Sequence, residues 1–304
     1  MSTHHRGAAV VVAMMIAALA ATVAVALAAD QQRWFADVTS RREQVQAQSL
    51  ALAGVQWARQ ILQDDARSGT IDHLGEPWAL SLPPTPIADG SIEGRIEDAQ
   101  ARLNLNNLVG DNQLSITERM RLGRVLSANG MSPGLLDAIA DWIDSDGTPR
   151  ASGAEDAAYR QAGATSLAAN APMVRTAELS SVRGLTAKDA HTLTPFVVAL
   201  PAGAAVNINT ASAAVLAAAF PELDGDALAG LITERARKPF TTMGDLRARL
   251  PPGVAIGDET SFTMSSNYFL VSVRSRQGNA LAQARALLKR DGRDWPTVLW
   301  QTLE

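Results

Sequence analysis

The first apolar segment of the chain runs from Ala8 to Ala29 without a charged residue, and Thr22 is its only polar side chain. At about 1.5 Å per residue this segment would form a helix of roughly 33 Å, long enough to cross a bilayer core of about 30 Å. We therefore predict a membrane-spanning helix over residues 8–29. Because Arg6 lies in the short flank before it, we expect that flank to stay in the cytoplasm and the rest of the chain to be exported.

The helical pattern continues beyond the membrane. Residues 30–67 contain no Pro, and Gly54 is their only Gly. Apolar residues recur among polar ones at the spacing of one helix face, namely at Val45, Leu52, Val55 and Leu62. Trp34 and Phe35 fall where aromatic side chains meet a membrane surface. We expect residues 30–67 to extend the same helix as an amphipathic segment.

Three interpretations of the N-terminus are open. The first is a plain anchor. The second is a secretory signal peptide cut after Ala28, which would leave Ala29 as the first residue. The third is a leader over residues 1–7, cut after Gly7 by a prepilin peptidase so that the helix stays attached and begins at Ala8. A signal peptide needs only ~7–15 apolar residues and does not continue into a long amphipathic helix, which favours the third interpretation.

The remaining chain combines strand patterns with a helical middle. Ser91–Glu97 alternates apolar and polar side chains, and Tyr268–Arg274 is a second strand candidate. A turn at Gln277–Asn279 leads into a third strand over 280–289, and Thr297–Trp300 predicts a last one. Pro83–Pro86 indicates a turn or loop. Residues 109–255 are helical and rich in Ala, with helix starts at Ser115 and at Ser132-Pro133.

Composition narrows the class of protein. The chain has 304 residues, 27 Lys and Arg against 31 Asp and Glu, and a net charge of −4. This balance argues against coating nucleic acid along the whole length. The absence of Cys excludes thiolate metal sites, disulfides and a cysteine nucleophile. The mean hydropathy of +0.00 is an average over one apolar segment and a polar body.

Five carboxylates lie within 16 residues and form the first candidate for chemistry. They are Asp141, Asp144, Asp146, Glu155 and Asp156. Such crowding is repulsive unless a cation relieves it, and hard oxygen ligands favour Ca²⁺. The spacing is not that of an EF-hand. A solvated acidic loop without a metal is the alternative.

A second candidate is a nucleic-acid interface. Val206–Ala211 contains Asn207, Asn209 and Thr210, and with the segments that follow it resembles helix-hairpin-helix modules of DNA-uptake proteins. Such modules bind phosphate through backbone amides of a Gly-containing hairpin. Here the hairpin segment 223–226 carries two carboxylates where phosphate would lie. Reuse of the scaffold without DNA binding is therefore the favoured interpretation.

Signals for an enzyme are weak. The chain lacks the Gly-x-Ser-x-Gly, Walker and dinucleotide-binding fingerprints. His73 and His191 are isolated, and Asn104, Asn106 and Asn107 fit turn capping better than catalysis. Four tryptophans are expected to be core anchors: Trp57, Trp78, Trp142 and Trp295. We predict that the protein is not an enzyme.

Several of these segments, in this order, resemble the type II secretion system protein K family, whose members are large minor pseudopilins. They are Arg6-Gly7 before the apolar helix, Gly94–Leu108, Asp141–Asp146, Gly153–Asp156, Glu178–Gly184 and Val206–Ala211. The resemblance implies an α+β, pilin-like fold, in which a long N-terminal spine helix packs on a small antiparallel sheet and a large, mainly helical domain is inserted. The expected parts are a leader (1–7), a transmembrane helix (8–29), its amphipathic continuation (30–67), a first β region (68–108), a helical insertion resembling SAM and helix-hairpin-helix domains (109–255), and a second β region (256–304).

The resemblance also implies a role. It predicts a single-pass inner-membrane protein with a periplasmic body, cleaved after Gly7 and methylated at Ala8, that lies at the tip of the pseudopilus and supports protein export across the outer membrane. The implied partners are prepilin peptidase and the minor pseudopilins I and J, with H left open, and nucleic acid is not expected. The family's calcium in the helical domain favours Ca²⁺ at Asp144, Asp146, Glu155 and Asp156, with Asp141 as a further candidate. A membrane-anchored DNA-binding protein is the alternative function.

Overall fold

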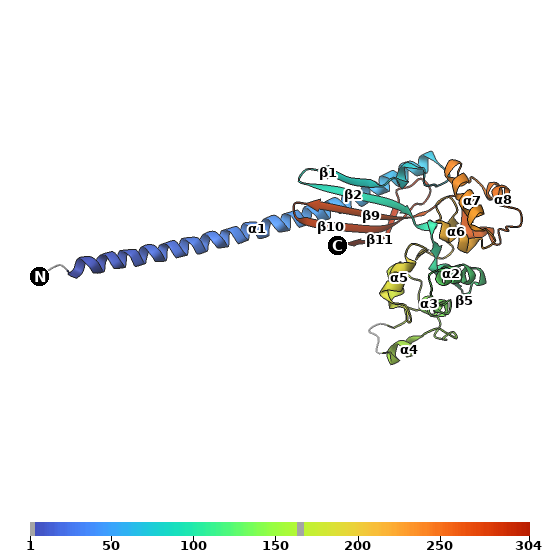
Figure 1. Cartoon of the computed structure of the whole chain (residues 1–304), viewed down its shortest axis with the longest axis horizontal. Coiled ribbons are helices and arrows are strands. Elements are labelled where there is room, and N and C mark those ends of the chain that lie inside the picture. Colours follow the sequence, from blue (N-terminus) through green and yellow to red (C-terminus); the bar gives the residue numbers. More distant parts are fainter. Residues whose placement is uncertain (1–3, 163–166) are drawn as a thin grey trace.

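One continuous helix, α1 (His4–Ser68), forms the spine of the molecule. The computed structural model describes residues 4–162 and 167–304. The first half of α1 projects away from the head without contacts to it (Figure 1). Val10, Ile16, Leu19 and Val25 are each more than half exposed there. Among the described residues, α1 is the helix that is long and apolar enough to cross a membrane. The predicted continuation of the apolar helix to Arg67 is confirmed.

A five-stranded antiparallel sheet packs against the second half of α1. Its strand order is β1-β2-β9-β10-β11, so strands far apart in the sequence are neighbours. The strands are β1 (Leu82–Ile87), β2 (Gly90–Asp98), β9 (Tyr268–Gln277), β10 (Ala280–Lys289) and β11 (Thr297–Leu303). The predicted strands over 91–97, 268–274, 280–289 and 297–300 are thus confirmed.

Small side chains bring α1 close to the sheet. Ala47, Ala51, Val55, Ala58 and Leu62 form a fully or almost fully buried face of the helix. Three alanines of β10 and the valines of β9 lie opposite them in the same apolar cluster. Because helix and sheet contact through short side chains, their backbones approach closely and little room remains for larger residues. Where α1 first meets the head, the backbone N–H of Asn279 in the β9–β10 turn donates to the Glu43 carboxylate at 3.0 Å.

The Pro-rich segment forms a strand, and the prediction of a turn or loop at Pro83–Pro86 is wrong. These residues lie in β1, which pairs antiparallel with β2 and occupies the edge of the sheet. Proline lacks a backbone donor, so it is tolerated in a strand only where that donor would face away from the ladder. An edge strand meets this condition, and its prolines also discourage pairing with another chain.

Three apolar residues lie on different surfaces from those expected. Val45 is 61 % exposed, since it lies outside the face of α1 that meets the sheet. Trp57 and Trp295 are 53 % and 40 % exposed, so the prediction that they are core anchors is wrong. Trp295 instead lies under the Arg59 guanidinium, 4.9 Å from the ring centroid. Trp78 and Trp142 are buried as predicted.

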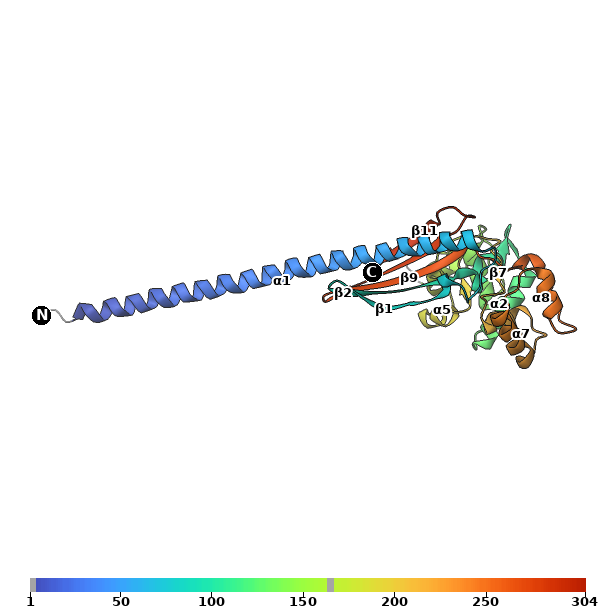
Figure 2. The same cartoon turned by 90° about the horizontal axis from the view of Figure 1, so that it is seen from above.

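A second body is inserted between β2 and β9. It occupies the end of the head remote from the N-terminus in both views (Figures 1 and 2). The bordering strands end at Asp98 and begin at Tyr268, a wider interval than the residues 109–255 predicted from the sequence. Its helices are α2 (Ile116–Ala128), α3 (Leu135–Ile143), α4 (Asp156–Gln161), α5 (Ala187–Leu193), α6 (Ala213–Ala219), α7 (Gly225–Arg237) and α8 (Met243–Arg249).

Short elements link these helices. Two-residue strands pair as β3 (Leu103–Asn104) with β6 (Val197–Val198), β4 (Val109–Gly110) with β5 (Gln113–Leu114), and β7 (Val206–Asn207) with β8 (Phe262–Thr263). The 3₁₀ helices of the chain are η1 (Pro77–Ala79), η2 (Ala99–Ala101), η3 (Leu105–Leu108), η4 (Thr176–Ser181) and η5 (Glu259–Ser261). Ser115 caps α2 as predicted, because its side chain accepts from the backbone N–H of Glu118.

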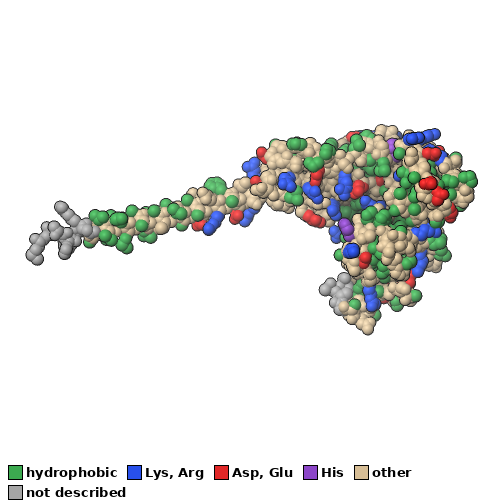
Figure 3. All heavy atoms as spheres, in the orientation of Figure 1, with side chains coloured by type: hydrophobic (Ala, Val, Ile, Leu, Met, Phe, Trp, Pro, Cys, Tyr) green, Lys and Arg blue, Asp and Glu red, His purple; other side chains and the backbone are tan. Residues whose placement is uncertain are grey.

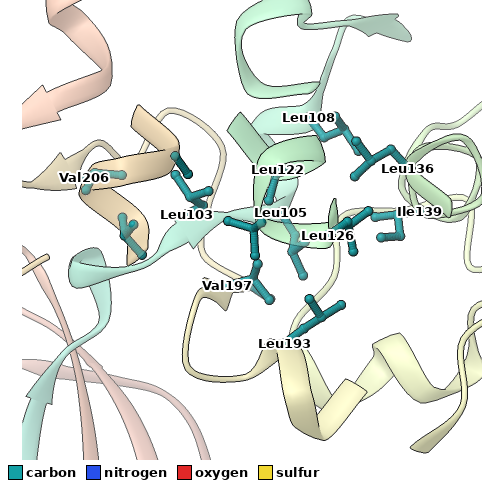
Figure 4. Packing of buried hydrophobic residues seen from close by; sticks show 14 of the residues in the cluster. Leu103, Leu105, Leu108, Leu122, Leu126, Leu136, Ile139, Leu193, Val197 and Val206 are labelled. Carbon is teal, nitrogen blue, oxygen red and sulfur yellow. The ribbon is translucent and has the colours of Figure 1, made fainter. Parts of the chain in front are cut away.

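The insertion has its own apolar core. Figure 4 shows Leu105, Leu122, Leu126 and Ile139 converging from the η3 turn, α2 and α3, with Leu193 and Val197 closing the cluster. This core is a separate cluster from the one between α1 and the sheet. The space-filling view shows apolar side chains along the thin part of α1 and charged side chains over the head (Figure 3). The described residues therefore form two large cores and one exposed apolar stem.

Candidate functional site

The predicted cleavage site lies in the first turns of α1, which includes Gly7 and Ala8. Residues 1–3 of the predicted leader lie outside the described part of the chain. Ala8 is exposed.

The acidic cluster forms where α3 ends and α4 begins. Asp141 lies on α3, Asp144 is the C-cap of that helix, and Asp146 follows in the loop. Glu155 is the N-cap residue of α4, and Asp156 is its first residue. One oxygen each from Asp144, Asp146 and Glu155 lies within 4.8 Å of the others. The fold thus brings three of the five predicted carboxylates to one point.

The carboxylates of this group are buried and incompletely satisfied. Glu155 is 5 % exposed and Asp144 is 2 % exposed. Both Glu155 oxygens and Oδ1 of Asp144 have no hydrogen-bond partner among the described residues. Burial, together with the charges of Asp141 and Asp144, raises the pKa of the Glu155 carboxyl to about 7. Buried acceptors without donors are costly, so this point in the fold fits a cation.

The other two predicted carboxylates have partners of their own. Asp141 is fully buried and accepts from the Arg150 guanidinium at 2.5 Å and from the Arg150 backbone N–H at 3.1 Å. Asp156 pairs with Arg160 one turn further along α4, at 3.0 Å. Neither residue belongs to the group of three whose oxygens converge.

Two residues that were not predicted as site residues also shape this site. Arg150 donates to both Asp141 and Oδ2 of Asp144. Gly153 lies so close to the Asp141 carboxylate that a Cβ atom at this position would overlap it. Gly153 begins a segment that carries the family resemblance, but its contact with Asp141 depends on the path of the loop, as does the position of Arg150. The sequence did hold one signal for Arg150, namely that it is a basic residue between the acidic residues Asp146 and Glu155.

The residues of the helix-hairpin-helix-like motif are buried and engaged. Nδ2 of Asn207 donates to the Asp72 carbonyl, to the Asp98 carboxylate and to Oγ of Ser266. Asn209 exchanges two hydrogen bonds with the backbone of Phe240, both within 2.9 Å. Thr210 donates to the Asp98 carboxylate. Because these side chains are used inside the protein, they are not available to bind phosphate.

This network lies where the insertion leaves and rejoins the sheet. Asp98 ends β2, and Ser266 precedes β9. Arg290 completes it, because its guanidinium donates to Asp65 at the end of α1, to Asp72 and to the Ser266 carbonyl. No local pattern marks Asp72, Asp98 or Arg290 as members of a network, because their partners are far away in the chain. Their arrangement indicates a structural joint.

The other polar residues singled out in the sequence have local roles. Asn104 caps η3, because its side chain accepts from the backbone N–H of Asn106 as the capping interpretation predicts. Nδ1 of His73 accepts from the Gly75 backbone N–H, and His191 is exposed in the last turn of α5.

Comparison with known proteins identifies relatives over most of the chain. Two models of the family described as type II secretion system (T2SS), protein K match residues 101–202 and 206–262. The type II secretion system protein K of Pseudomonas aeruginosa is 33 % identical over 279 residues, which cover 88 % of this chain and 83 % of the relative. The protein of the same name from Pectobacterium carotovorum subsp. carotovorum is 30 % identical over 310 residues, covering 96 % and 94 %.

A solved structure shares the fold. It is a chain of the GspK-GspI-GspJ complex from the type 2 secretion system of enterotoxigenic Escherichia coli. It matches with a TM-score of 0.76 and 25 % sequence identity, over 88 % of this chain and 99 % of that one.

Proposed function

Because the chain belongs to the type II secretion system protein K family and is a minor pseudopilin of that system, we propose that it lies at the tip of the periplasmic pseudopilus. Two features support this position. The apolar half of α1 is suited both to cross a membrane and to pack against other helices in a bundle. The insertion enlarges the head at the end remote from the membrane, where a terminal subunit has room for it. Antibody labelling of isolated pseudopili tests the proposal, because label distributed along the fibre would contradict it.

We propose the minor pseudopilins I and J as partners in this assembly. The support is the solved complex, whose K chain shares the fold of this protein. We further propose that the N-terminus faces the cytoplasm and the head faces the periplasm, with Arg6 as the orienting charge. A cysteine introduced into the head should then react with a membrane-impermeant thiol reagent in intact spheroplasts. Protection of that cysteine would contradict the orientation.

The observation that carries the proposed function is the single helix α1. An exposed apolar stem continues without a break into a face that packs on an antiparallel sheet. A secreted protein cut after Ala28 would lose the stem, whereas a pseudopilin cut after Gly7 keeps it.

N-terminal processing tests this proposal directly. Expressed with a prepilin peptidase, the chain should begin at Ala8 and carry one added methyl group, as intact-mass spectrometry would show. Gly7→Val should leave the precursor uncut, because the residue at the cleavage point changes. Ala28→Val is the matched control and should be processed normally. A mature chain that begins at Ala29 would contradict the proposal.

We propose that Asp144, Asp146 and Glu155 hold Ca²⁺. The support is the convergence of their oxygens and the buried acceptors without partners. A calcium ion there would offset two of the three negative charges and tie the end of α3 to the start of α4. This assignment keeps three of the residues predicted from the sequence and leaves Asp141 and Asp156 out of the ligand set.

Calcium removal provides the test. A chelator should lower the thermal midpoint of the full chain in detergent, and added Ca²⁺ should restore it, because binding stabilises only the folded state. Glu155→Gln should reduce this response, and Asp156→Asn should preserve it as the matched control. A midpoint that does not respond to Ca²⁺ or chelator would show that no stabilising ion binds.

We do not propose the DNA-binding alternative or a catalytic activity. Asn207, Asn209 and Thr210 serve the internal network, and the family is a structural component of the secretion apparatus.

A further inference from the structure

Arg150 occupies a defined position inside the acidic cluster. One guanidinium nitrogen, Nη1, donates to Oδ1 of Asp141 and to Oδ2 of Asp144. Its own backbone N–H donates to the other oxygen of Asp141 at 3.1 Å. The Arg150 side chain is 18 % exposed, and both carboxylates it contacts are fully buried as side chains. The guanidinium is therefore a fixed, largely desolvated charge.

The two oxygens of the Asp144 carboxylate differ in their partners. Oδ2 faces Arg150, whereas Oδ1 has no hydrogen-bond partner among the described residues. Asp141 shares the Arg150 guanidinium with Asp144, whereas Asp146 and Glu155 each bring an oxygen within 4.8 Å of an Asp144 oxygen. The geometry offers two neighbouring positions for positive charge that share Asp144, and the protein fills one of them itself.

We propose that Arg150 is a built-in cation of this centre, so that the centre binds one divalent ion beside it and not two. This inference rests on the calcium site proposed above and assigns its stoichiometry to one residue. Arg150 then acts as a positioning residue, because it holds Asp144 with one oxygen turned toward the ion.

The charges of the buried groups support this number. Asp141, Asp144 and Glu155 are 0 %, 2 % and 5 % exposed and together carry three negative charges when ionised. One guanidinium and one divalent ion supply three positive charges, which neutralises the buried set. Asp146 is only partly buried, so water can solvate its charge. A second divalent ion beside Arg150 would leave excess positive charge in a desolvated place, which is costly.

Metal counting on variants of the full chain in detergent tests this assignment. After equilibrium dialysis against Ca²⁺, elemental mass spectrometry should find one equivalent in the wild type. Arg150→Gln should raise the count to two, because Asp141 and Asp144 lose their internal cation. Arg150→Lys keeps the charge and should stay at one. Arg160→Gln is the matched control, since Arg160 pairs with Asp156 outside the converging group, and it should also stay at one.

Each outcome separates this inference from the calcium proposal. Two equivalents in the wild type would overturn the role of Arg150 and leave the calcium site standing. No bound Ca²⁺ in the wild type would overturn the site and with it this inference, whereas the pseudopilin function would be untouched. A folded Arg150→Gln variant that still binds one ion would also contradict it. If that variant does not fold, the wild-type and Arg150→Lys counts decide, and Tb³⁺ luminescence titration of both proteins provides a second count.

Discussion

Asp98 shows how one carboxylate can hold several segments together. It is 3 % exposed and accepts from the Gln100 backbone N–H, Oγ of Ser266, Oγ1 of Thr210 and Nδ2 of Asn207. Burial raises the pKa of the Asp98 carboxyl to about 6, against the lowering effect of the Ser266 and Thr210 hydrogen bonds. The charge of Asp72 raises this pKa further, and Arg290 faces the network through Asp72 and Ser266.

This raised pKa predicts a pH dependence of stability. The folded state binds a proton at Asp98 more tightly than the unfolded state, so the contribution of Asp98 is largest below about pH 4 and is lost as the pH rises through about 6. Asp98→Asn removes this titration. The gap in thermal midpoint between wild type and Asp98→Asn should therefore shrink between pH 4 and pH 7, as measured by near-ultraviolet circular dichroism. Asp37→Asn, at an exposed carboxylate of α1, is the control. A difference in thermal midpoint that widens as the pH rises would contradict a raised pKa at Asp98.

At the scale of the element, α1 depends on a close approach that one glycine permits. A Cβ atom at Gly54 would lie 2.6 Å from one γ-methyl group of Val273 and 3.0 Å from the other. Glycine is unfavourable in a helix interior by roughly 0.5–1 kcal/mol relative to Ala, so its use here reflects the contact with the sheet.

Enlarging this position should separate the helix from the sheet. We expect Gly54→Leu to destabilise the head by about 1–3 kcal/mol, because the added atoms overpack a buried contact. Chemical unfolding of the full chain in detergent measures the loss. Ala53→Leu is the matched control, since Ala53 is exposed on the neighbouring position of the same helix. Equal stabilities of the two variants would show that the sheet adjusts without cost.

At the scale of the whole molecule, a buried polar joint links two apolar cores. Arg290 connects Asp65 on α1, Asp72 after it and Ser266 at the return of the insertion. A small apolar cluster of Ala99, Val198, Leu200 and Leu287 lies beside the joint and contains residues from both bodies.

Removing Arg290 should uncouple the two bodies. Arg290→Ala leaves Asp65 and Asp72 without their cation, which costs about 3–5 kcal/mol for a buried pair. We expect differential scanning calorimetry to resolve two transitions in this variant and one in the wild type. Arg293→Ala is the control, because the Arg293 side chain is exposed and its hydrogen bond with α1 is made by the backbone carbonyl, which the substitution keeps. A single transition at lower temperature in Arg290→Ala would contradict this prediction, because it would show that the two bodies still unfold together and that Arg290 only adds stability to the whole.

Local sequence patterns predicted most helices and strands. The features that they did not predict depend on pairing between residues far apart in the chain. Periodicity was sufficient for α1 and the β9–β10 hairpin, because each element carries its own apolar spacing. It failed at Pro83–Pro86, where only the edge position in the sheet makes a strand possible. For Trp57 it could not say which side of α1 would meet the sheet. The carboxylate cluster was visible because its members are close in sequence, whereas Arg290 and Asp72 are 218 positions apart.

The adjacent entry and exit of the insertion also determine how the molecule carries mechanical force. Asp98 pairs directly with Phe269 across β2 and β9, so the insertion departs and returns at one point of the sheet. The strands run roughly along the spine (Figure 1). A pull on the membrane stem is therefore transmitted in shear from α1 to β2, β9 and β10, where many contacts share the load. The acidic cluster lies between α3 and α4 inside the insertion, away from the direct contact of α1 with these strands, so that contact can carry tension without passing it through the cluster.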